Sequence, residues 1–175
     1  MTEEPVYTIG HSTRSSDELL HVLEASGIEV IADVRRMPGS RRLPQFDSAT
    51  LQRSLAGRGM EYCWIPQLGG RRRSASASRN TGWRHAAFRA YADHIATEEF
   101  ADGLFDFLMV ARGRPTAVMC AEVLWWRCHR RLIADVLVSL GLRVVHIFEV
   151  GKQEEHRLAP PARLVRGELS YERES

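Results

Sequence analysis

The fold is decided by residues 118–132, which read Val-Met-Cys-Ala-Glu-Val-Leu-Trp-Trp-Arg-Cys-His-Arg-Arg-Leu. An apolar run over residues 115–119 breaks off at Cys120 and Glu122, and a helical pattern begins around Cys128. Two thiols, a carboxylate, an imidazole and a guanidinium therefore fall within one turn between a strand and a helix. Such turns, at the carboxyl ends of parallel strands, carry the binding and catalytic groups of open α/β sheets. The stretch thus predicts both a fold class and a candidate site.

Apolar runs of strand length alternate with helical segments along the rest of the chain. We predict strands at residues 6–9, 28–34, 61–65, 116–120 and 143–148. Helical spacing and capping signals predict helices over residues 15–27, 47–57, 88–95, 97–113 and 128–141. Each connection is long enough for a crossover helix, so the strands should be parallel. We expect a single three-layer α/β domain over residues 1–150, Rossmann- or flavodoxin-like with about five mostly parallel strands, followed by a polar, loosely packed tail over residues 151–175.

The length and composition of the chain fit one domain. Its 175 residues, 44% of them hydrophobic, can bury one good core. No window approaches the roughly eighteen apolar residues of a membrane span, and the N-terminal residues are acidic where a signal peptide is basic. We therefore expect a cytoplasmic protein without a membrane partner. The three cysteines cannot all pair and lack the C-x-x-C spacing of a structural zinc site, so free thiols are expected.

Charge is segregated along the chain. The formal net charge is +2, but residues 1–34 carry one Arg against seven acids, whereas residues 35–84 carry eleven Arg against two acids. A basic block of this kind indicates an anionic partner, either a phosphate-bearing small molecule or a nucleic acid. The plainer interpretation is codon bias, because 23 of the 24 basic residues are Arg, although such a bias would not explain their clustering.

Polar clusters follow four of the predicted strands. They begin at His11, at Asp33, at residue 68 and at Cys120. Parallel strands place all of these turns at the same edge of the sheet, so the clusters should converge on one cleft. The residues we expect to bind an anionic ligand there are Ser12, Arg14, Arg35, Ser40, Arg41, Gly69, Gly70, Arg71, Tyr91, His129 and Arg130. The Gly/Ser/Arg-rich stretch at residues 67–82 is expected to be a mobile loop and a candidate lid.

Five side chains are candidates for chemistry, namely Cys120, Glu122, Cys128, His11 and Asp33. Cys128, at the start of a helix, has the position that lowers a thiol pKa, whereas Cys120 can equally be a small buried hydrophobe. Glu122 is the preferred proton-transfer group, because Asp33 can simply pair with Arg35.

A metal site formed by Cys120, Cys128 and His129, with His11 or Glu122 as the fourth ligand, is a further hypothesis, since thiolate and imidazole suit zinc or iron. This hypothesis depends on the convergence of the turns and not on ligand spacing. The chain contains no nucleotide-cofactor motif, so the cofactor stays unknown.

Six clusters agree in type and order with a known family. They are Thr8-Ile-Gly-His-Ser12, Asp33-Val-Arg35 with Pro38-Gly-Ser-Arg41, Pro44-Gln-Phe46, Leu68-Gly-Gly70, Phe88 with Tyr91-Ala92, and Cys120-Ala-Glu122 with Cys128-His-Arg130. Together they resemble the domain of unknown function 488 family, from residue 7 to about residue 148. The resemblance implies a small bacterial or archaeal cytosolic α/β protein and no settled activity. Between the thiols the family often carries a Pro, where this chain has Val123-Leu-Trp-Trp126.

The chain also looks partly like a rhodanese or a cysteine phosphatase. In those enzymes a thiolate sits in a loop of backbone N–H groups at a helix N-terminus. The phosphatase loop has five residues between Cys and Arg with glycines among them. Here six residues separate Cys120 from Arg127, none is Gly, and Glu122 lies among them. A carboxylate there would oppose both the thiolate and a bound anion.

Three functions remain as hypotheses from the sequence. The leading one is a cytosolic enzyme that binds a phosphorylated small molecule or nucleotide in the cleft. The second is a nucleic-acid-binding module that uses the basic residues 35–84. The third is a metal- or thiol-redox-responsive protein that uses Cys120 and Cys128, with rhodanese- or phosphatase-like activity as a variant of it.

Overall fold

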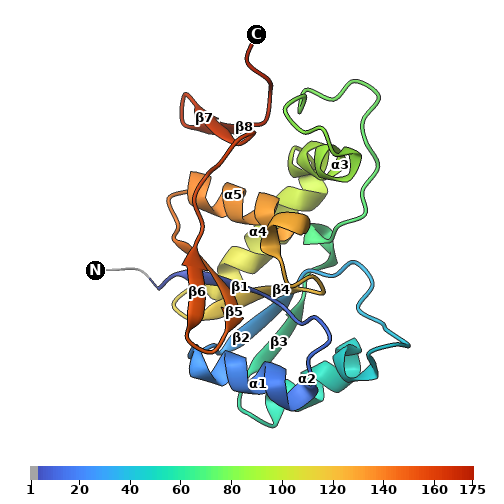
Figure 1. Cartoon of the computed structure of the whole chain (residues 1–175), viewed down its shortest axis with the longest axis vertical. Helices are drawn as coiled ribbons and strands as arrows, with labels where there is room; N and C mark the ends of the chain where they lie inside the picture. Colours follow the sequence, from blue (N-terminus) through green and yellow to red (C-terminus); the bar gives the residue numbers. More distant parts are fainter. Residues whose placement is uncertain (1–3) are drawn as a thin grey trace.

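A mixed sheet of six strands forms the centre of the molecule. The computed structural model describes residues 4–175 (Figure 1). The strands are β1 (Val6–Gly10), β2 (Val30–Asp33), β3 (Glu61–Trp64), β4 (Thr116–Cys120), β5 (Val144–Glu149) and β6 (Lys152–Glu155). Their order across the sheet is β3-β2-β4-β1-β5-β6. β1 to β5 run parallel and β6 pairs antiparallel with β5, so the predicted, mostly parallel α/β sheet is confirmed.

Helices cover both faces of the sheet (Figure 1). One face carries α1 (Ser16–Ala25) and α2 (Ser48–Ala56), and the other carries α3 (Ala86–Ile95), α4 (Glu98–Ala111) and α5 (Arg130–Ser139). The start of α1 is fixed by its N-cap, because the Ser15 hydroxyl accepts a hydrogen bond from the N–H of Glu18. Among residues 4–175, no helix combines the length and the apolar character that crossing a membrane requires.

A hydrophobic core lies on each face of the sheet. The core beneath α1 and α2 includes Leu19, Leu23, Leu51 and Leu55. The core beneath α3, α4 and α5 includes Phe100, Phe107, Leu132 and Leu137. The central strands β2 and β4 are buried over their whole length, which explains why their sequences are apolar on both faces.

The strands that precede the polar clusters end level with one another. Gly10 of β1 pairs with Cys120 of β4, and Asp33 of β2 is in register with Met119 and Trp64. The turns after β1, β2, β3 and β4 therefore leave the same edge of the sheet, as the sequence predicted. β1 and the turn after β4 are also in close contact, because a Cβ on Gly10 would lie 1.8 Å from the carbonyl oxygen of Glu122.

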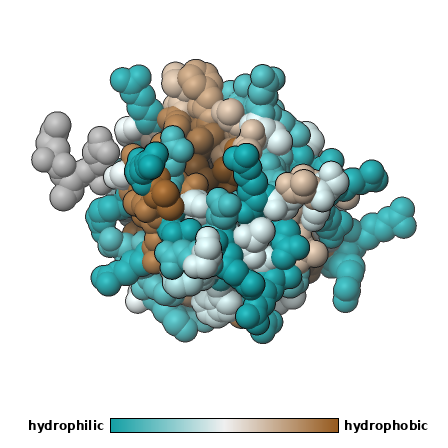
Figure 2. All heavy atoms as spheres, turned by 90° about the horizontal axis from the view of Figure 1, so that it is seen from above, coloured by the Kyte–Doolittle hydropathy of each residue, from teal (hydrophilic) through white to brown (hydrophobic). Residues whose placement is uncertain are grey.

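The C-terminal segment is more ordered than its sequence indicated. Residues 151–175 were predicted to pack loosely, but they supply β6 and a hairpin of β7 (Arg163–Val165) and β8 (Glu168–Ser170). His156 and Tyr171 are buried because both bond to the carboxylate of Asp135 in α5, each at 2.7 Å. The end of the molecule seen in Figure 2 is largely hydrophilic, with one area where hydrophobic atoms gather.

Candidate functional site

A cavity of about 980 Å³ opens at the carboxyl edge of the sheet. Its wall is formed by the turns after β2, β3 and β4 and by the N-terminal part of α3. Of the predicted site residues, it brings together Cys120, Glu122, Cys128, Arg35, Gly70, Arg71, Tyr91 and His129. Turns far apart in the sequence thus share one cavity.

Two thiols lie in contact in the cavity wall. Cys120 ends β4, Cys128 lies two residues before the start of α5, and their Sγ atoms are 2.9 Å apart. Both side chains are buried, yet both line the cavity. The backbone N–H of Arg130 points at the Cys128 sulfur, 3.5 Å away. Cys128 therefore has the position at a helix N-terminus that the sequence predicted.

The two thiols differ in their acidity. The pKa of Cys128 is lowered to about 7, mainly by the hydrogen bond with Cys120 and further by the charge of Arg130, against the effect of burial. Burial raises the pKa of Cys120 well above its ordinary value. The Cys120 thiol thus acts as the donor when Cys128 ionises. The lowered pKa of Cys128 favours its thiolate, which is the nucleophilic form.

His129 lies against Cys128 with its lone pair free for the thiol. Its Nε2 is 3.1 Å from the carbonyl oxygen of Val34, to which only an N–H can donate. Burial lowers the pKa of His129, so the ring is neutral and Nδ1 carries the lone pair. Nδ1 lies 3.3 Å from the Cys128 sulfur. His129 can therefore accept the Cys128 proton.

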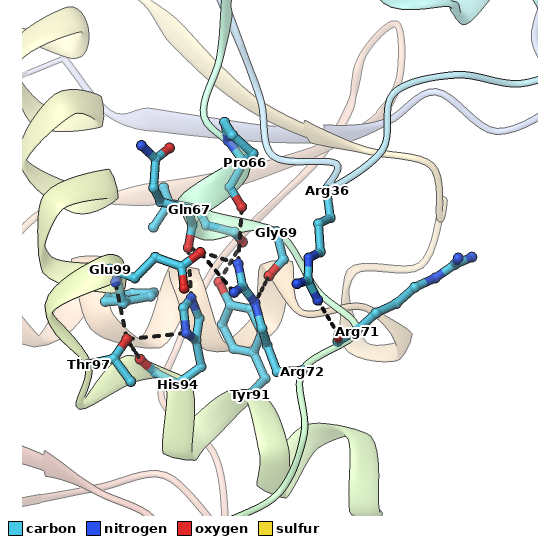
Figure 3. A network of polar contacts seen from close by, with 12 residues as sticks. Arg36, Pro66, Gln67, Gly69, Arg71, Arg72, Tyr91, His94, Thr97 and Glu99 are labelled. Atoms are coloured by element: carbon cyan, nitrogen blue, oxygen red, sulfur yellow. Dashed lines mark hydrogen bonds and ion pairs between the residues drawn. The ribbon is translucent and has the colours of Figure 1, made fainter.

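The turn after β3 is held by a network of side chains beneath it (Figure 3). Arg72 donates to the carbonyl oxygens of Gly69, Pro66 and Gln67 at 2.9–3.3 Å and forms an ion pair with Glu99 at 2.9 Å. The Tyr91 hydroxyl donates to Leu68 O at 2.7 Å, and Arg36 donates to Arg71 O at 2.8 Å. This network fixes the backbone that presents Gly70 and Arg71 to the cavity.

The cavity wall is cationic. Arg35, Arg36, Arg71 and Arg127 line it. Among the described residues of the wall, Glu122 alone carries a carboxylate, and its side chain is exposed. The carboxylate contacts the N–H of Leu124 at 3.4 Å.

Arg14 and Arg130 lie outside the cavity wall. Arg130 is buried and donates to the carbonyl oxygens of Glu122 and Val123, at 2.5 Å and 3.0 Å. Arg14 donates to the carbonyl oxygens of Gly10 and Phe148. Arg130 therefore holds the turn after β4 in place and Arg14 bridges the ends of β1 and β5, and neither residue lines the cavity.

Asp33 and His11 form a buried layer beneath the cavity. Asp33 makes a two-point ion pair with Arg35, at 2.9 and 2.7 Å, and accepts a hydrogen bond from the Tyr62 hydroxyl at 2.6 Å. His11 stacks on Phe46 and lies 3.4 Å from Arg35. Burial lowers the pKa of His11 to about 4, so the ring is neutral. These groups orient Arg35, which does face the cavity.

Other predicted ligand residues also lie outside the cavity wall. Ser12 contacts the turn after β4 through its backbone N–H, 3.0 Å from the Ala121 carbonyl oxygen. Ser40 accepts from the N–H of Leu43 at 3.0 Å, Arg41 is exposed, and Gly69 is buried against Arg36. The candidate lid, residues 67–82, is bonded to α3. The Asp93 carboxylate accepts hydrogen bonds from the Ser78 hydroxyl, the Asn80 amide and the backbone N–H of Ala75.

Part of the wall was not predicted as site. The additional residues are Arg36, Met37, Gly39, His85, Ala87, Phe88, Ala121 and Arg127. Phe88 is an aromatic residue whose place in the sequence fits a core as well as a cavity. The available signal was the position of residues 125–127 inside the turn between the two thiols, where they form a short 3-10 helix.

The described residues contain no cluster of side chains that supports the metal hypothesis. Within residues 4–175, no three His, Cys, Asp or Glu side chains are grouped so that they could hold a metal ion. In particular, His129 directs Nε2 at a backbone carbonyl and Nδ1 at Cys128 alone.

The sheet and its cavity define an α/β protein with a thiol pair in a cationic cleft. A family model described as "Domain of unknown function DUF488" matches residues 15–137, which is more than half of the chain. The chain therefore belongs to the DUF488 family, as its motifs predicted. No curated protein and no solved structure matches it.

Proposed function

We propose that this protein is an enzyme that acts on a phosphorylated small molecule or nucleotide, with Cys128 as the nucleophile. The observation that carries the proposal is the contact of Cys128 Sγ with His129 Nδ1, 3.3 Å apart, in the wall of the cavity. A thiol next to a base and at a helix N-terminus is the arrangement that activates a cysteine nucleophile.

The charge of the wall supports an anionic substrate. Arg35, Arg36, Arg71 and Arg127 face the same space as Cys128, and guanidinium groups bind phosphate through paired hydrogen bonds. The Arg35 guanidinium is held in place by its two-point ion pair with Asp33. The phosphate would be bound beside the nucleophile.

Aromatic side chains in the wall support a planar group on the same substrate. Phe88, Tyr91 and Trp126 line the cavity, and Trp126 is exposed. Stacking on such rings suits a nucleotide base and tolerates any of the bases. A nucleotide therefore fits the wall better than inorganic phosphate alone.

The reaction would be a group transfer through a covalent thiol intermediate. His129 would accept the proton of Cys128 as the sulfur attacks an electrophilic centre of the substrate. Glu122, whose exposed carboxylate lies in the same wall, would then exchange a proton with the leaving group or with the attacking water. His11 and Asp33 would act through Arg35 as positioning residues.

A protection experiment tests the proposal directly. Iodoacetamide alkylates Cys128, and we expect a nucleoside monophosphate, at saturating concentration, to slow this alkylation several-fold. Arg127→Gln should weaken the protection, whereas the matched variant Arg41→Gln should not, because Arg41 is exposed and lies outside the wall. An unchanged alkylation rate at every concentration of nucleotide, with inorganic phosphate also without effect, would contradict the proposal.

A further inference from the structure

We propose that Cys120 and Cys128 form a site of reversible oxidation, at which a peroxide that enters the cavity converts the two thiols into a disulfide. The proposal depends on the proposed function only for its effect on activity. The disulfide itself can be observed without any substrate.

The geometry already places the two sulfurs in contact. They are 2.9 Å apart, within about an ångström of the ~2.05 Å length of a disulfide bond. Cys120 ends β4 and Cys128 lies just before α5. Arg130 of α5 already contacts the turn after β4 through the carbonyl oxygens of Glu122 and Val123, so a disulfide would link two segments that are held together without it.

The surroundings decide which sulfur reacts first. Cys128 has its ionised form stabilised by the Cys120 thiol and by the backbone N–H of Arg130. Cys120 lies at the end of a buried strand, and burial raises its pKa, so it is the thiol that reacts second. It attacks the oxidised Cys128 and forms the disulfide. Both residues line the cavity, which gives a small peroxide a route to the pair.

The chemistry balances in two steps. In the first, the Cys128 thiolate attacks the terminal oxygen of a hydroperoxide, an S–O bond forms, the O–O bond breaks, and the alkoxide or hydroxide leaves and takes a proton from water. In the second, the sulfur of Cys120 attacks the sulfur of the Cys128 sulfenic acid. An S–S bond forms, the S–O bond breaks, and the hydroxyl leaves as water with the Cys120 proton. The two thiols supply the two electrons that reduce the peroxide.

The chain contains its own control thiol. Cys63 in β3 is more exposed than either member of the pair, yet burial and the charges of Glu61 and Asp106 raise its pKa. Reactivity should therefore follow ionisation and not exposure. We expect peroxide to consume Cys128 roughly tenfold or more faster than Cys63 at neutral pH.

The test is intact-mass and peptide analysis of the full chain after reduction, desalting and one equivalent of hydrogen peroxide. We expect a loss of two hydrogens, a peptide that links Cys120 to Cys128, and full recovery of the thiols with dithiothreitol. Cys63→Ser should behave in the same way. Cys120→Ser should instead accumulate a sulfenic acid at Cys128 that dimedone traps, and Cys128→Ser should form no internal disulfide.

Two results would overturn the proposal. One is that Cys63 oxidises as fast as Cys128 in the wild-type chain. The other is that Cys128 passes to sulfinic acid, or links to a second chain, without forming the internal disulfide. Both are measured on the wild-type protein, so they do not depend on the folding of a variant. A disulfide without any nucleotide protection in the alkylation experiment would refute the proposed function and leave the redox site intact.

Discussion

Gly70 and His129 show how closely the candidate site is packed at the level of single residues. A Cβ on Gly70 would lie 3.0 Å from His129 Nδ1, the atom that faces Cys128. The absence of a side chain at residue 70 therefore allows the imidazole to take its position beside the thiol.

The variant Gly70→Ala should displace the His129 ring and slow alkylation of Cys128 at pH 7 several-fold. The physical reason is loss of the proton acceptor next to the sulfur, while the fold is retained. Gly57→Ala is the matched control, because a Cβ there meets only ordinary contacts at 3.5 Å or more and the backbone is already helical. Equal rates for the two variants would contradict the role given to His129.

Buried neutral histidines make stability depend on pH. Burial lowers the pKa of His11 to about 4 and that of His146 to about 2, whereas the same groups titrate near 6.5 in the unfolded chain. Below pH 6.5 the unfolded state binds more protons, so the free energy of unfolding falls as the pH falls. The decline should approach about 1.4 kcal/mol per pH unit for each histidine.

Urea unfolding between pH 7 and pH 5.5 measures this effect, since most carboxylates stay ionised over that range. Wild-type stability should decrease toward pH 5.5. The variant His11→Asn should show a shallower decrease, because one of the buried histidines that take up a proton on unfolding is gone. A free energy of unfolding that stays constant over this range would refute the assignment of these rings as neutral.

The sequence predicted the identity of many site residues better than their tasks. Cys128 was expected at a helix N-terminus, and the structure places it there. Arg14 and Arg130 were expected to bind an anion, but both guanidiniums donate to backbone carbonyls. A sequence does not reveal which carbonyl oxygens a turn leaves without partners, so it cannot separate an arginine that binds ligand from one that holds a loop.

At the level of elements, a buried chain of hydrogen bonds joins α5 to β1 and β5. Arg130 donates to the Thr8 hydroxyl at 3.1 Å, and that hydroxyl contacts His146 Nδ1 at 2.6 Å. His146 Nε2 contacts His156 Nδ1 at 2.8 Å, and His156 then bonds to Asp135. Each group of this chain can donate a hydrogen bond to the next one, in the direction from Arg130 to Asp135. The chain thus runs from a buried cation to a buried carboxylate.

Tyr171→Phe should loosen the C-terminal segment from α5. The change removes one of the two hydrogen bonds to Asp135, and we expect a loss of about 1–2 kcal/mol in the free energy of unfolding. Hydrogen exchange should accelerate at residues 163–171 while the amides of β1 and β4 keep their protection. Exchange that is unchanged in the hairpin would mean that other contacts hold it. Tyr7→Phe is a control, because it removes the same hydroxyl group from a residue of β1 that makes no hydrogen bond to Asp135.

The predicted elements agree with the structure where hydrophobic periodicity is strong. The five parallel strands were found because central strands are apolar on both faces. β6 was missed because all four of its residues are exposed and polar, as suits an edge strand. The hairpin of β7 and β8 was missed because its strands have only three residues each, too few for an apolar pattern to show along the chain.

At the level of the whole molecule, positive charge is concentrated at the cavity wall. The net charge is only +2, yet four arginines and one carboxylate share the cavity wall. A field of this kind acts on the charge of a ligand and is screened by salt.

Binding of a nucleoside monophosphate should therefore weaken as sodium chloride rises from low to physiological concentration. A neutral nucleoside should bind more weakly and without this dependence, because it retains only the stacking contacts. Titration calorimetry at several salt concentrations measures both. Equal affinity for the charged and neutral ligands would show that the arginines do not contribute to binding.

The network around Arg72 has a consequence for the kinetics of any ligand. Three carbonyl oxygens of the turn after β3 already have a fixed partner before a ligand arrives (Figure 3). The turn after β3 is therefore preorganised: its conformational entropy is lost during folding and is not lost again when a ligand binds. Ligand binding should accordingly occur in a single kinetic phase. Its observed rate constant should rise linearly with ligand concentration, without the plateau that a slow rearrangement would cause.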